Sequence, residues 1–150
     1  MPVDDPIRGI YYAAFDLEGA VVEVFGDSPR VVTRGTNRVV RSRLNTPLRL
    51  LDLRGRGGML AGPSAAISQT ETRALSQEWA RYFYQKPKTY ERLDGLIYAN
   101  SHNYMDAVAL FERAAPAIIG ATRKITRLAS PAYDAEVGRI AIANNLTIEP

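Results

Sequence analysis

The sequence contains no cysteine and only one histidine, His102, and these scarcities narrow the chemistry open to the chain. Without cysteine there is no disulfide framework, no thiol nucleophile and no cysteine-ligated metal. One histidine is a poor basis for a zinc site, and no spacing suggests a Ser-His-Asp triad. We therefore expect no metal. The lack of cysteine is also compatible with a reducing compartment.

Long apolar runs and a strong excess of charge are also lacking. No run approaches the roughly 18 apolar residues that span a bilayer, and the opening MPVDDP is acidic where a signal peptide is basic. Lys and Arg number 19 against 16 Asp and Glu, a formal charge of +3 that does not by itself imply nucleic acid. We expect a cytoplasmic protein of one domain, residues 1–150, with no membrane contact and no direct nucleic-acid contact.

The most informative stretch that is present runs over residues 9–27. The apolar run 10–15 is too short for a helix and predicts a buried strand, after which Asp16 suits a helix N-cap. An apolar stripe at the helical period follows, formed by Leu17, Ala20, Val21 and Val24. Glu23 lies off this stripe. It is either a solvated helix residue or a carboxylate directed along the sheet edge into a cleft.

The rest of the chain predicts several strands and few helices. Strands are expected over 48–53, 96–99 and 106–111, with helices over 70–85 and from Ser130 to about Asn144. Strands and helices do not alternate regularly, which favours an α+β fold with a mixed sheet. The glycine-rich residues 54–58 match no phosphate-binding motif and predict a connection.

An arginine-rich segment, residues 30–44, has two readings. It carries five arginines among valines, with a predicted hairpin turn at Gly35-Thr36-Asn37. Such a segment could bind phosphate groups, but the alternation of Val and Arg is also typical of the solvent face of an antiparallel strand, which we favour.

The strand over 96–99 ends in the polar cluster Asn100, Ser101, His102 and Asn103. Ligand-binding groups often collect in loops after buried strands. Asn and Ser at such a position are also ordinary turn residues. Both readings remain open from the sequence.

Three blocks of the chain together resemble a known family. They are GIYYAAFDLEGAVVEVF; LRLLDLRG with the helix ending in QEWARYFYQ; and LDGLIYANSHNYMDAVALFER. Their order and spacing resemble the RES domain, the toxin half of a bacterial toxin-antitoxin pair that degrades NAD⁺.

The resemblance implies an ADP-ribosyltransferase-like, largely antiparallel α+β fold and cleavage of the nicotinamide-ribose bond, with phosphate or water as the acceptor. NAD⁺ would be the substrate, with no further cofactor, and the partner a cognate helix-turn-helix antitoxin. Glu23 matches the family Glu as the catalytic residue, and Tyr12, eleven residues earlier, matches a pocket Tyr. Asn100 or Ser101 would take the role of the family Ser.

The family Arg has no counterpart by register, because it precedes the Tyr by tens of residues and Arg8 stands too close to Tyr12. We therefore expect that an Arg-bearing N-terminal segment is missing and that activity is weak or lost. The alternative is a catalytically dead remnant that acts only by binding the antitoxin.

Overall fold

The structure is a computed structural model and describes residues 9–57 and 92–150. The predicted helix over 70–85 lies outside these residues. In chain order the described elements are β1 (Tyr11–Ala14), α1 (Leu17–Phe25), β2 (Val31–Val32), β3 (Arg38–Arg43), β4 (Leu50–Asp52), β5 (Gly95–Ala99), β6 (Asp106–Leu110), the 3₁₀ turn η2 (Glu112–Ala114), α5 (Ala115–Ile119), β7 (Thr122–Arg127), the 3₁₀ turn η3 (Pro131–Tyr133), α6 (Asp134–Ala143) and β8 (Thr147–Ile148).

The main sheet has the strand order β1-β6-β5-β4. Strand β6 is antiparallel to both β1 and β5, whereas β4 is parallel to β5. The fold is therefore α+β with a mixed, largely antiparallel sheet, and this prediction is confirmed. Because β1, β4 and β5 run in the same direction, they end at one edge of the sheet, which we call the carboxyl edge.

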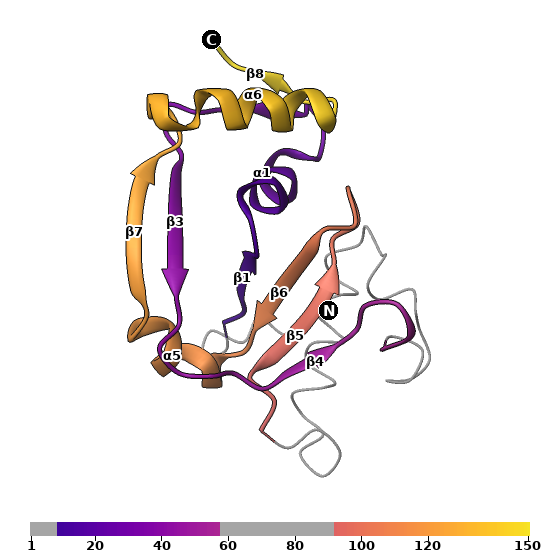
Figure 1. Ribbon diagram of the computed structural model, residues 1–150. Coiled ribbons are helices and arrows are strands. Elements are labelled where there is room, and N and C mark those ends of the chain that lie inside the picture. The colour runs from indigo at the N-terminus through magenta and orange to yellow at the C-terminus, as the bar shows by residue number, and fades with distance from the viewer. Residues whose placement is uncertain (1–8, 58–91) are drawn as a thin grey trace.

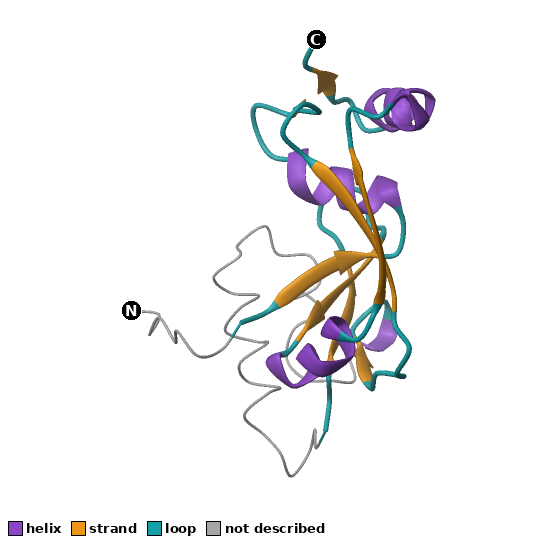
Figure 2. Ribbon diagram, turned by 90° about the vertical axis from the view of Figure 1, so that its left-hand side faces the viewer, coloured by secondary structure: helices purple, strands orange, loops and turns teal. Residues whose placement is uncertain are grey.

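Four further strands pair outside this sheet. Strand β2 pairs in parallel with β8, and β3 pairs antiparallel with β7. Figure 1 shows β3 and β7 side by side, with α6 at one end of the pair and α5 at the other. Figure 2, turned by 90°, keeps α6 and β8 at one end of the molecule. The described part is thus a main sheet with two separate two-stranded pairs, β2 with β8 and β3 with β7.

Helix α1 begins where the sequence predicts. The Asp16 Oδ1 atom accepts a hydrogen bond of 2.7 Å from the Gly19 N–H, which confirms Asp16 as the N-cap. The predicted apolar stripe was wrong at Val24, which is 64% exposed, while Val22 is 2% exposed. The buried side of α1 faces α6 and β2, so the residues covered are Leu17, Val21 and Val22.

The core around α1 is completed from the far end of the chain. Val137 and Ile140 of α6 are 0% and 1% exposed and belong to the same cluster as Val22. Val32 of β2 and Leu146, just before β8, also belong to it. Helix α1 is therefore supported from behind by residues more than a hundred positions later in the sequence.

Two other local predictions were wrong. The run over 10–15 forms a strand, but Tyr11 and Tyr12 are 42% and 40% exposed, because β1 is an outer strand of the order β1-β6-β5-β4. Gly35-Thr36-Asn37 does not close a hairpin, because the strands on either side of it pair with β8 and β7 instead of with each other. Within the described ranges, no helix is long and apolar enough to cross a membrane.

Candidate functional site

Helix α1 presents one face to the turn that follows β5. Gly19, Glu23 and Gly26 stand at i, i+4 and i+7 and so share a face of the helix. A Cβ atom at Gly26 would lie 2.9 Å from the His102 ring, and one at Gly19 would lie 3.7 Å from the Met105 Cβ atom. The turn over residues 100–105 therefore runs along this face. Glu23 lies between the two glycines and is partly buried.

The turn itself is built by Asn100, which is 1% exposed. Its Oδ1 atom accepts hydrogen bonds from the N–H groups of His102 and Asn103, at 3.0 and 2.9 Å. Its own N–H donates to the Met105 carbonyl at 2.9 Å, and its carbonyl accepts from the Tyr104 N–H at 3.1 Å. One buried side chain thus closes the turn that lies against α1.

The side-chain amide nitrogen of Asn100 has no hydrogen-bond acceptor among the described residues. This Nδ2 group is nevertheless fully buried. A buried donor without an acceptor costs about 1–3 kcal/mol, so its retention in a native protein requires an explanation, of which a functional role is one. Because Oδ1 is already engaged, Asn100 can offer only a donor to a ligand.

Of the other two predicted site residues, Tyr12 can be placed relative to α1. Side chains of a strand alternate between faces, so Tyr12 shares a face with Ala14, whose Cβ is 3.2 Å from where a Cβ on Gly19 would stand. Tyr12 is therefore on the sheet face next to α1. Ser101 is partly buried beside Asn100.

Polar contacts that the sequence did not predict hold the turn and α1 in place. Asn103 Nδ2 donates to Asn144 Oδ1 at 3.2 Å, and Asn144 Nδ2 donates to Glu18 Oε1 at 2.9 Å. His102 Nε2 lies 3.6 Å from Asp27 Oδ1. Asn144 is 126 residues from Glu18. No local pattern could have revealed this network, because its members meet only in the folded chain.

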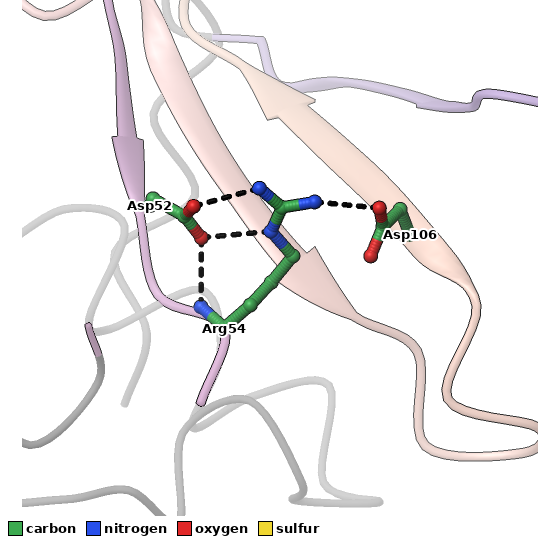
Figure 3. Close-up of polar contacts among 3 residues, drawn as sticks. All are labelled: Asp52, Arg54 and Asp106. Carbon is green, nitrogen blue, oxygen red and sulfur yellow. Dashed lines mark hydrogen bonds and ion pairs between the residues drawn. The ribbon is translucent and has the colours of Figure 1, made fainter. Parts of the chain in front are cut away.

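A second missed cluster lies at the carboxyl edge (Figure 3). The Arg54 guanidinium donates to both carboxylate oxygens of Asp52, at 2.8 and 2.7 Å, and to Asp106 Oδ2 at 2.6 Å. Asp52 ends β4 and Asp106 begins β6, so Arg54 reaches across the end of β5, from which Asn100 follows. The only sequence sign was the spacing Asp-Leu-Arg.

These contacts shift both ionisable groups toward their charged forms. The hydrogen bonds from Arg54 lower the pKa of Asp52 to about 2, and the two carboxylates raise the pKa of Arg54. Arg54 is thus engaged by two anions and is not a free cation for phosphate. Within residues 9–57 and 92–150, no three carboxylate or imidazole side chains are grouped so that they could hold a metal ion.

A model of the RES domain family matches residues 3–134, most of the chain. The chain belongs to the RES domain family. The match includes Tyr12, Glu23, Asn100 and Ser101. Searches of curated proteins and of solved structures returned no match. RES membership is consistent with a toxin-like role.

Proposed function

We propose that this RES domain cleaves the nicotinamide-ribose bond of NAD⁺, with Glu23 as the catalytic carboxylate. The observation that carries the proposal is the placement of Glu23. It is partly buried on the face of α1 along which the 100–105 turn runs, and that turn contains a buried, unpaired amide donor in Asn100. A carboxylate and an unpaired donor on two neighbouring elements are a combination suited to a polar, partly cationic substrate.

The chemistry requires a negative charge at this place. When nicotinamide leaves, it takes the bonding electron pair and becomes neutral, so positive charge develops at the ribosyl carbon. A fixed carboxylate stabilises that charge most strongly in the transition state. Phosphate or water then adds to the same carbon, and an added water loses a proton. Glu23 would supply the carboxylate and orient the acceptor.

The neighbouring side chains would hold the substrate. Asn100 Nδ2 lacks an acceptor, and NAD⁺ offers phosphate, ribose and carboxamide oxygens, which would reach this buried group once the 100–105 turn shifts on binding. Tyr12, on the sheet face next to α1, would pack against nicotinamide or ribose, and Ser101 would provide a second hydrogen bond. We also propose that a cognate helix-turn-helix antitoxin binds this chain and covers the site.

The test measures NAD⁺ loss with purified protein, with and without phosphate. Glu23→Gln should lower the rate by about 10²–10³. Glu112→Gln, an exposed acid on η2, serves as the matched control and should leave the rate unchanged. The product identifies the acceptor, because phosphate gives a ribosyl phosphate and water gives free ADP-ribose.

Two results would contradict the proposal. One is turnover by Glu23→Gln at the rate of the unsubstituted chain. The other is an unsubstituted chain that neither consumes nor binds NAD⁺ but co-purifies with the antitoxin, which would identify a binding protein without catalysis.

A further inference from the structure

The two-stranded ribbon of β3 and β7, residues 38–43 and 122–127, carries an unusual concentration of positive charge. Neither strand contains an acidic residue. The six cationic residues of this basic ribbon are Arg38, Arg41, Arg43, Arg123, Lys124 and Arg127, and all six are exposed. The chain as a whole carries only +3, so the charge is local. A concentration of this kind generates a strong positive potential at the surface.

The register of the ribbon places like charges directly opposite each other. Arg38 stands opposite Arg127, and Arg41 stands opposite Lys124. Like charges in directly opposed positions destabilise a strand pair. Among the described residues, no acidic side chain forms an ion pair with any of the six, whereas the nearby Arg34 is paired with Asp134. The repulsion therefore has no counter-charge within the described part of the chain.

The two faces of the ribbon differ. On the inner face, Val39 packs against the core cluster that contains Val22, and the Arg41 guanidinium lies 5.8 Å from the centre of the Tyr133 ring. On the outer face, Val40 and Ile125 stand opposite each other and are 47% and 58% exposed. This outer face is available to a partner.

The outer face alternates charge and apolar surface in three cross-strand rows. Going along the ribbon, the rows are Arg38 with Arg127, then Val40 with Ile125, then Ser42 with Arg123. The Arg123 guanidinium is fixed by hydrogen bonds to the carbonyls of Ile118 and Ile119, at 2.9 and 3.3 Å. An apolar pair is thus bracketed by cations at both ends.

We propose that the outer face of the basic ribbon binds an acidic segment of another protein that also carries aliphatic side chains. Acidic groups of the segment would neutralise the end rows, and an aliphatic side chain would cover Val40 and Ile125. A nucleic acid fits less well. The face has no aromatic ring on which a base could stack and no Asn or Gln to read a base edge. A phosphate backbone would also leave the apolar central row, Val40 with Ile125, exposed to water.

The test uses a labelled ten-residue peptide in which pairs of Glu alternate with pairs of Val, so that each face of the extended peptide presents Glu and Val in turn. Its binding to the whole chain is followed by fluorescence anisotropy. Saturable binding that weakens as salt rises is the expected result. The double variant Arg38→Glu/Arg127→Glu should weaken binding at least about tenfold, since two attractive charges become repulsive. The control Arg56→Glu/Arg139→Glu changes the net charge equally at exposed sites off the ribbon and should leave binding within about twofold.

Two single substitutions distinguish an effect on peptide binding from an effect on the stability of the protein. Arg127→Glu places an acid opposite Arg38, so it should raise the unfolding midpoint of the protein and lower its affinity for the peptide. Val40→Thr does not change the charge of the ribbon, and it should lower the affinity for the peptide several-fold. The proposal is overturned by an absence of saturable binding or by equal losses in the ribbon and control double variants. The proposal would also be overturned if duplex DNA bound more tightly than the peptide and Val40→Thr left the affinity for DNA unchanged. That result would indicate a nucleic-acid-binding surface.

Discussion

At the scale of single residues, Asn100 combines two roles in one side chain. Its oxygen organises the 100–105 turn through the N–H groups of His102 and Asn103, while its buried nitrogen has no acceptor among the described residues. Serine at this place would have one hydroxyl for both roles, whereas asparagine separates them. The sequence could place a polar residue here, but it could not show which atom is engaged and which is unpaired.

We expect Asn100→Ala to destabilise the protein by about 1–2 kcal/mol, because two turn N–H groups lose their acceptor while removal of the unpaired donor offsets part of the loss. The free energy of urea unfolding measures this effect. Asn45→Ala is the control, since Asn45 is exposed and makes a single hydrogen bond of 2.8 Å to the Gly120 carbonyl. Equal stability of Asn100→Ala and the unsubstituted chain would show that Asn100 does not hold the turn.

At the scale of elements, glycine at one end of α1 permits the turn to approach. Gly26→Ala would place a methyl group against the Val22 carbonyl oxygen of α1 itself and 2.9 Å from atoms of the His102 ring, so only the second contact reports on the turn. We expect a loss of about 1–3 kcal/mol, as for other overpacked positions. Displacement of the turn should also weaken NAD⁺ binding, measured by isothermal titration.

The matched control is Gly138→Ala in α6, where an added Cβ would meet nothing within 4 Å. In a helix interior this substitution should stabilise the protein by about 0.5–1 kcal/mol. Opposite signs for the two Gly→Ala changes are the expected signature. Stabilisation by both would mean that the turn does not lie tightly against α1.

Local elements could be predicted where their cause is local. Asp16 caps α1 through a contact three residues away, so the sequence alone reveals it. The partners of β2 and β3 could not be predicted, because they lie at least 79 residues later (Arg43 to Thr122) and a turn motif at 35–37 says nothing about them. The sequence indicated Glu23 through family resemblance. It could not show that Glu23 lies on the face of α1 next to the 100–105 turn, because that contact joins segments far apart in the chain.

At the scale of the whole molecule, the Asp52–Arg54–Asp106 cluster predicts how stability responds to acid. The pKa of Asp52 falls from 3.8 to about 2 through its hydrogen bonds with Arg54. A lowered pKa means that the stabilisation is fully present above about pH 4 and is lost as the pH falls through about 2. The cluster is partly exposed, so high salt should reduce the effect.

The measurement compares the urea midpoint of the unsubstituted chain with that of Asp52→Asn across this range. The difference should be constant near neutral pH and should shrink as the pH falls from about 4 to about 2. Glu149→Gln, an exposed change near the C-terminus, should show no such convergence. A difference for Asp52→Asn that does not depend on pH would contradict the role of the cluster.

The support of α1 by α6 has a consequence for the order of events during synthesis. The family match ends at residue 134, yet the core behind α1 includes Val137, Ile140 and Leu146. Glu23 is translated more than a hundred residues before the surfaces that fix its helix. We therefore expect a nascent chain that stops short of α6 to leave α1 without its packing partners, so that Glu23 is held in place only after residues 137–146 have been translated.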